Sequence, residues 1–96
     1  MHFGRFKLKP EWVDQYFEVH GKFICEGLSD RYIAQTGEDS YCFVGLWESK
    51  EALVSARPKM IAHLDEVRGF MKELSPELGV TDAVSGDIVA YGTERL

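Results

Sequence analysis

Residues 41–47 constrain the fold most, because they predict a strand with two apolar faces. Side chains alternate across a strand, so odd-numbered and even-numbered residues point to opposite sides. The two faces consist of Tyr41, Phe43, Gly45 and Trp47 on one side and Cys42, Val44 and Leu46 on the other. A half-exposed antiparallel strand would instead alternate apolar with polar residues. We therefore expect this strand to be covered on both sides.

The residues before this strand predict one strand and one long helix. Residues 2–9 predict a strand that ends at Pro10, and proline suits the first position of a helix. Apolar residues then recur at helical spacing over residues 10–26, and Gly27 follows as a stop. The apolar face of this predicted helix comprises Trp12, Val13, Tyr16, Phe17, Val19, His20, Phe23 and Ile24.

A hairpin is predicted next. Residues 31–36 have the composition of a strand, and the turn residues 37–40 join them to the apolar strand. Strands this close in sequence pair in antiparallel fashion. Ser49 then has the side chain that suits the N-cap of a following helix.

The second half of the chain predicts two helical segments separated by Pro58. The residue before a proline avoids helical geometry, so a short helix over residues 50–56 is expected to break there. A longer amphipathic helix is expected over residues 58–74. The remaining segments are predicted as a loop over residues 77–86, the last strand over 87–91 and a short tail over 92–96.

The resulting order, βαββαβ, predicts a single α+β domain over residues 1–96 with a ferredoxin-like fold. Four strands would form an antiparallel sheet, and both helices would cover one of its faces. The apolar strand requires a cover on the other face as well, and a domain of 96 residues has only a marginal core of its own. We therefore expect a homodimer that pairs through the open sheet face.

Composition excludes several other classes of function. The net charge is −5 and no basic run is present, which argues against nucleic-acid binding. No apolar run has the length of a membrane span, and the N-terminus lacks a signal-peptide core, so a cytoplasmic protein is expected. Cys25 and Cys42 lack the spacing of metal ligands and are expected to be small buried residues.

The chain resembles the antibiotic-biosynthesis-monooxygenase-like family, whose members are dimeric α+β barrels. Residues 43–53, Phe-Val-Gly-Leu-Trp-Glu-Ser-Lys-Glu-Ala-Leu, carry the resemblance, and residues 47–53 are its most specific part. Residues 78–86 also resemble a loop of some bacterial members. The family includes cofactor-independent oxygenases that act on polycyclic phenols and quinols, haem-degrading enzymes and proteins without an established reaction.

The resemblance favours the oxygenase branch over the haem-degrading branch. Haem degradation in this family uses an Asn on the first strand and a Trp followed by a His on the second helix. The chain has no Asn, and no Trp precedes His63 on that helix. The oxygenases line their cavity with a strand tryptophan, which Trp47 matches, although the Asn that accompanies it there has no counterpart in this chain.

His20 and His63 are the candidate catalytic residues. His20 lies within the apolar face of the first helix, where it is either a hydrogen-bonded core residue or a base in a cavity. Histidine suits the second role because it titrates near neutral pH. His63 lies at the edge of the second apolar face, where it is either structural or at the mouth of a pocket. Both helices cover the same sheet face, so the two histidines are expected to line one cavity.

Candidate substrate-binding residues are aromatic side chains and one arginine. Trp47 and Phe43 share a strand face with Tyr41. This face is part of the core, part of a dimer interface or a platform for a flat ligand. Tyr16 joins them from the first helix. Arg31 is either an exposed edge residue, a dimer-interface ion pair or a group that steadies an enolate-like oxygen. Further possible hydroxyl donors are Tyr32 and Tyr91.

Two functions remain open on the sequence. The first is an oxygenase-like enzyme without metal or cofactor, in which a histidine deprotonates a small aromatic substrate and the anion activates O₂. Two histidines alone are a weak basis for a metal site, so no metal is expected. The second is a non-catalytic module that binds a small molecule in the same pocket.

Overall fold

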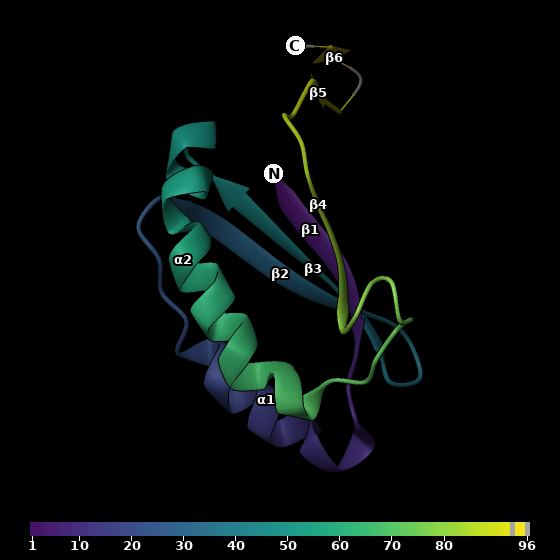
Figure 1. The fold of residues 1–96 in the computed structure, drawn as a ribbon. Helices are drawn as coiled ribbons and strands as arrows, with labels where there is room; N and C mark the ends of the chain where they lie inside the picture. The colour runs from purple at the N-terminus through teal and green to yellow at the C-terminus, as the bar shows by residue number, and fades with distance from the viewer. Residues whose placement is uncertain (93, 96) are drawn as a thin grey trace.

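The computed structural model describes residues 1–92, 94 and 95, and its main body is a four-stranded sheet with two helices on one face (Figure 1). All strand pairs are antiparallel, in the order β2-β3-β1-β4. The elements of this body are β1 (His2–Lys7), α1 (Val13–Gly21), β2 (Leu28–Gly37), β3 (Ser40–Trp47), α2 (Lys50–Val67) and β4 (Thr81–Ser85). The predicted α+β, ferredoxin-like architecture is therefore confirmed.

The register of the sheet places four residues in one row on the face that carries the helices. Gly45 on β3 lies opposite Arg31 on β2 and opposite His2 on β1, and His2 in turn lies opposite Ser85 on β4. Directly opposite residues point to the same side of a sheet. The glycine lies between an arginine and a histidine, and the side chains of Leu28 and Trp47 pack against it: a Cβ there would be 3.4 Å from Leu28 Cδ1 and from Trp47 Nε1.

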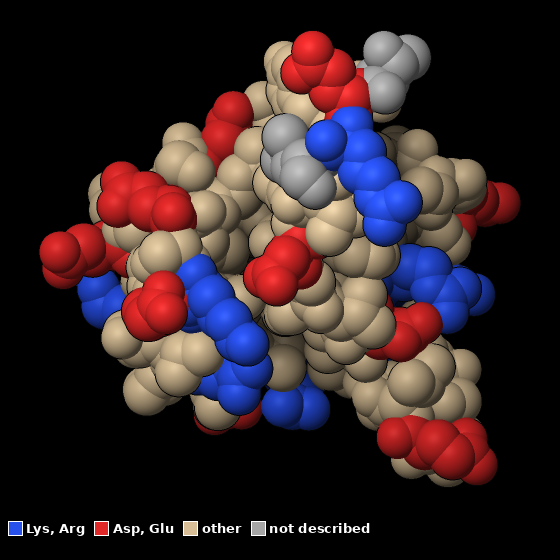
Figure 2. Space-filling view, turned by 90° about the horizontal axis from the view of Figure 1, so that it is seen from above, with Lys and Arg blue, Asp and Glu red and all other residues tan. Residues whose placement is uncertain are grey.

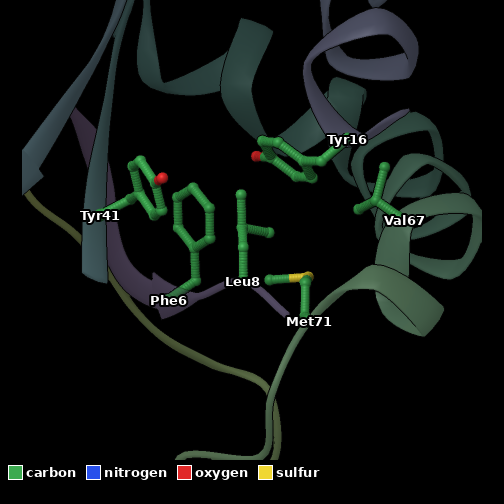
Figure 3. Packing of buried hydrophobic residues seen from close by; sticks show 6 residues of the cluster. All are labelled: Phe6, Leu8, Tyr16, Tyr41, Val67 and Met71. Atoms are coloured by element: carbon green, nitrogen blue, oxygen red, sulfur yellow. The ribbon is translucent and has the colours of Figure 1, made fainter. Parts of the chain in front are cut away.

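A small apolar core joins the helices to the sheet (Figure 3). Phe6 is 1% exposed and Leu8 is 0% exposed, which makes them the most deeply buried large side chains. Phe6 contacts Tyr16 of α1 and Tyr41 of β3, with ring centroids 5.2 and 5.6 Å away. The cluster consists of Phe6, Leu8, Tyr16, Tyr41, Val67 and Met71.

The first helix is shorter than predicted. A 3-10 turn over Pro10–Trp12 precedes α1, which ends at Gly21, so the predicted extension to residue 26 is wrong. Ile24, placed on the apolar face by helical spacing, is 81% exposed. Gly27 is not the helix stop either. Its φ is +86°, and a Cβ there would lie 2.6 Å from the Cβ of Ala52, so glycine is required for close packing against α2.

The second helix runs through Pro58 without the predicted break. α2 is continuous over Lys50–Val67, and Ser49 is its N-cap, as predicted. A 3-10 turn over Arg68–Phe70 follows, so the helical segment ends before residue 74. Proline removes one hydrogen bond from a helix, here the bond to the carbonyl of Val54. Val54 and Pro58 are both exposed, so water can satisfy this carbonyl and the helix tolerates the proline.

The fourth strand lies in the segment predicted to be a loop. β4 (Thr81–Ser85) pairs with β1, whereas the strand predicted over residues 87–91 is absent from the main sheet. A salt bridge from Arg5 to Asp82, at 2.5 Å, stabilises this pairing. The end of the chain forms a separate two-stranded ribbon of β5 (Ala90–Tyr91) and β6 (Glu94–Arg95) (Figure 1). Thr93 and Leu96, part of the predicted tail, lie outside the described residues.

The opposite face of the sheet, which we call the bare face, is not covered by any described helix or strand. Its centre is apolar, and large side chains on it are accessible to solvent: Tyr32 is 58% exposed and Val84 is 48% exposed. Cross-strand pairing places these residues on it: Phe3, Tyr32, Cys42, Val44, Leu46 and Val84. The strand predicted to have two apolar faces therefore packs against the helices on one side only.

On the face shown in Figure 2, Lys and Arg lie interspersed with Asp and Glu, so the charges on that face are not segregated by sign. In the described part of the chain, no helix has both the length and the apolar character of a membrane span.

Candidate functional site

A cavity of about 310 Å³ lies between the sheet and the two helices. An engineered apolar cavity of about 150 Å³ holds benzene, so this space suits two fused rings. Its wall is mostly apolar, and Ile61, which is 60% exposed, marks where it meets the surface beside α2. All three histidines of the chain line it, at positions His2, His20 and His63.

The structure brings His20 and His63 into direct contact; we call them the histidine pair. Nδ1 of His20 on α1 lies 3.3 Å from Nε2 of His63 on α2. Each ring is also held by a stacked aromatic neighbour. Tyr16 stacks on His20 with centroids 5.6 Å apart, and Phe23 stacks on His63 with centroids 4.6 Å apart. The two ring orientations are therefore fixed by packing as well as by the hydrogen bond.

One hydrogen bond between two neutral imidazoles leaves the pair with a defined chemistry. A neutral imidazole has one N–H donor and one acceptor nitrogen. If His63 donates to His20, the free lone pair is on Nδ1 of His63; if His20 donates, it is on Nε2 of His20. Either way, the pair retains one basic nitrogen and one N–H donor. This combination can accept a proton from a substrate and donate a hydrogen bond.

The surroundings keep the histidine pair neutral. Burial lowers the pKa of His20 to about 4, with smaller contributions from His63 and from the positive charge of Arg31. Burial also lowers the pKa of His63, and Arg31 adds to this while the nearby Glu66 carboxylate opposes it. Both rings are therefore in the basic, unprotonated form at neutral pH.

We expect the protein to lose stability as the pH falls from about 6.5 to about 4. In this window the unfolded chain binds a proton at His20 that the folded chain does not, so acid favours unfolding. Because His20 is only partly buried, the loss is on the order of 1 kcal/mol. Urea denaturation at pH 7 and pH 5 measures it.

The comparison variant is His20→Gln, which lacks the titrating group. Its free energy of unfolding is expected to change less between pH 7 and pH 5 than that of the unmodified protein. An equal change in both proteins would show that His20 is not the group responsible. The charged or titratable groups around it are Tyr16, His63 and Arg31, with Glu66 next to His63.

Arg31 caps α1 and is not an exposed edge residue. Its guanidinium donates to the carbonyl oxygens of Phe23 and of His20, the latter at 3.4 Å, and also to that of Gly21 at 3.4 Å. These carbonyls lie at and just beyond the end of α1, so the guanidinium satisfies acceptors that the helix leaves unpaired or only partly paired. The side chain thus brings a positive charge close to the histidine pair while its donors are used by the backbone.

Trp47, Phe43 and Tyr16 line the cavity, as Gly45 does. The indole Nε1 of Trp47 is buried without a hydrogen-bond partner in the described structure. A buried donor without an acceptor costs about 1–3 kcal/mol. This atom packs against Gly45, 3.4 Å from the place of a Cβ there, so the indole ring and not its N–H faces the cavity. Phe43 packs between His2 and Phe6, with centroids 5.3 and 6.3 Å away, so it faces the core and not the bare face.

The hydroxyl groups of the other two predicted donors are directed elsewhere, although Tyr32 is among the residues that line the cavity. The hydroxyl of Tyr32 donates to the carboxylate of Asp30 on the bare face, at 2.6 Å. Tyr91 is 79% exposed on the terminal ribbon. Neither hydroxyl is in contact with the histidine pair.

Sequence reasoning missed two residues of the cavity, His2 and Arg57. His2 follows from the alternation of the first strand, which puts it on the same side as Phe6, but only the register places it beside Gly45. Its pKa is lowered by burial, by the N-terminal ammonium group and by Arg57. Arg57 was assigned to a helix break, and no periodic signal marked it as a lining residue.

No protein-family model and no curated protein sequence matches the chain. Solved structures do. A candidate antibiotic biosynthesis monooxygenase from Chloroflexus aurantiacus is similar with a TM-score of 0.63, 14% sequence identity and coverage of 95% of this chain and 94% of that one. A second candidate of this kind, from Deinococcus radiodurans, has a TM-score of 0.63, 10% identity and coverage of 95% and 96%.

A third similar structure is SnoaB from Streptomyces nogalater, described as a cofactor-independent oxygenase. It has a TM-score of 0.54, 11% identity and coverage of 91% of each chain. At these identities the likeness establishes the fold. The chain has the fold of antibiotic-biosynthesis-monooxygenase-like proteins, so the resemblance inferred from its sequence is confirmed at that level.

Proposed function

We propose that the protein is a cofactor-independent oxygenase-like enzyme acting on a small, flat phenol or quinol, and that it is cytoplasmic. The observation that carries this proposal is the histidine pair, which presents an unprotonated base to an apolar cavity of about 310 Å³. A general base must be unprotonated and lie close to the proton that it removes, and both rings meet the first condition at neutral pH. The fold shared with oxygenases adds support by analogy.

In the proposed reaction the substrate supplies all the electrons. The histidine pair takes the phenol or quinol proton, and the resulting anion transfers one electron to O₂. Superoxide and the substrate radical combine at carbon to give a hydroperoxide. Loss of water from the hydroperoxide leaves a new carbonyl group, so each O₂ consumed yields one oxygenated product and one water. No external reductant enters this balance.

Trp47 and Phe43 are proposed to hold the flat substrate. Both line the cavity, and aromatic rings pack favourably against the face or edge of a flat ligand. Tyr16 contributes by fixing His20, on which it stacks.

We also propose that two copies of the chain pair through the bare face. This face has an apolar centre and a hydrogen-bonded salt bridge, Arg5 to Asp82, beside it. A patch of this composition on a sheet is typical of an interface between identical subunits. The second copy would provide the cover that the central strand requires.

The alternative is a non-catalytic module that binds a small molecule in the same cavity. The chain has no Asn to accompany Trp47, and the two arginines and three histidines that line the cavity can serve binding alone. This alternative predicts the same ligand preference without turnover.

The test is oxygen uptake by the purified protein with a panel of anthrones, hydroquinones and catechols. We expect uptake above the uncatalysed rate, with one product formed per O₂ consumed. Heat-denatured protein at the same concentration is the control for trace metals and surface effects. Uptake no faster than the control with every member of the panel would contradict the oxygenase and favour the binding module.

A further inference from the structure

The cavity is lined by basic groups and by no acid. Asp and Glu make up 16 of the 96 residues and the chain carries a net charge of −5. None of these acids lines the cavity, whereas two arginines and all three histidines do: Arg31, Arg57, His2, His20 and His63. The electrostatic character of this space is therefore opposite to that of the chain as a whole.

Arg57 is the cation that is available to a ligand. In the described structure no carboxylate lies within ion-pair distance of Arg57 or Arg31. The guanidinium of Arg31 already donates to carbonyls at the end of α1. That of Arg57 makes no hydrogen bond to another described residue, and it is close enough to His2 to lower the pKa of that ring. Arg57 and His2 thus form a basic end of the cavity without a counter-charge.

The rest of the cavity is shaped for a flat apolar body. Its volume of about 310 Å³ is about twice that of an engineered cavity that holds benzene, so a fused ring system fits in it. Its walls are aliphatic and aromatic, and they include Phe43, Met60, Ile61 and Leu64. The space beside Gly45 is filled by Leu28 and Trp47, whose Cδ1 and Nε1 atoms lie 3.4 Å from the place of a Cβ on the glycine.

We infer that the cavity binds a planar aromatic anion, with an acidic oxygen group such as a carboxylate at Arg57 and the ring system between the apolar walls. The inference rests on the site of the proposed function and narrows its substrate to aromatic compounds that carry an acidic group. Arginine recognises carboxylates by paired, charge-assisted hydrogen bonds. An apolar wall with one charged group is the usual design of a site that orients a small ligand.

The experiment compares three naphthalene compounds of nearly equal shape: 2-naphthoate, the neutral 2-naphthamide and the cationic 2-naphthylmethylammonium ion. Binding to the full-length protein is measured at pH 7 by isothermal titration calorimetry. We expect 2-naphthoate to bind at least about tenfold more tightly than 2-naphthamide, because a charge-assisted bond is stronger than a neutral one. The ammonium compound is expected to bind most weakly.

Arg57→Gln tests the assignment of the basic end. It is expected to weaken 2-naphthoate about tenfold and to leave 2-naphthamide unchanged. Arg68→Gln is the matched control, since Arg68 is exposed, pairs with Asp65 at 3.4 Å and does not line the cavity. This control is expected to bind both compounds as the unmodified protein does.

Equal affinity for the acid and the amide, or an Arg57→Gln variant that binds 2-naphthoate normally, would overturn the inference. The absence of binding by all three compounds would overturn it as well. None of these measurements depends on turnover. Selective binding of 2-naphthoate without oxygen uptake from any substrate would keep the anion site and remove the oxygenase. Oxygen uptake from neutral quinols, together with equal binding of 2-naphthoate and 2-naphthamide, would keep the oxygenase and remove the anion site.

Discussion

Oxygen uptake is expected to fall by a factor of about 10²–10⁴ when His63 is replaced by alanine, the usual contribution of a general base. His20→Ala is expected to have an effect of the same order, because the two rings act as one unit joined at 3.3 Å. Removing either leaves the other without its hydrogen-bond partner and without a fixed tautomer. Initial rates on the best substrate of the panel measure both variants.

His63→Gln separates a base from a structural residue. Glutamine keeps a donor and an acceptor near His20 but does not take up a proton at neutral pH. We expect this variant to fold with near-normal stability and to be as inactive as His63→Ala. Glu51→Ala, an exposed change in the first turn of the same helix, is expected to retain the full rate. Normal uptake by both histidine variants would show that the pair has no part in the reaction.

Val44→Asp is expected to separate the proposed dimer. Val44 lies at the centre of the bare face, on β3 and opposite Phe3 and Tyr32. In a two-fold pair each copy would bury an unpaired carboxylate, at a cost of several kcal/mol. The dissociation constant is therefore expected to rise at least about 100-fold. Sedimentation equilibrium over a range of concentrations measures it.

Val54→Asp is the matched control for this experiment. It makes the same substitution on α2, at a residue that is 48% exposed and away from the bare face. It is expected to remain dimeric. A well-folded monomer of the unmodified protein, even at high concentration, would contradict the proposed interface.

The sequence predicted the layered fold because apolar periodicity carries that information. The double-faced strand, the hairpin and the Ser49 cap follow from local patterns, and each is present. Its errors lie where tertiary contacts decide. Arg31 donates to carbonyls at the end of α1, and β4 pairs with β1 although its sequence, Thr-Asp-Ala-Val-Ser, is not strongly apolar.

The candidate site was predicted in part for the same reason. The two histidines were assigned to one cavity from helical spacing, and the structure brings them together. The stacking of Tyr16 on His20 follows from their i,i+4 spacing on α1, whereas that of Phe23 on His63 depends on the path of the chain after α1 ends. Arg57 and His2 line the same cavity from elements whose relative placement no local pattern specifies.

The hydrogen bond between His20 and His63 also holds two helices together. Within the described residues it is the side-chain hydrogen bond that joins α1 to α2, the two helices that cover the cavity. A proton taken from a substrate would be held by these two rings until it leaves. One added proton can be shared between the rings, whereas a second would make both rings positively charged, so that they repel each other. The number of protons on the pair would therefore affect how closely α1 and α2 pack over the cavity.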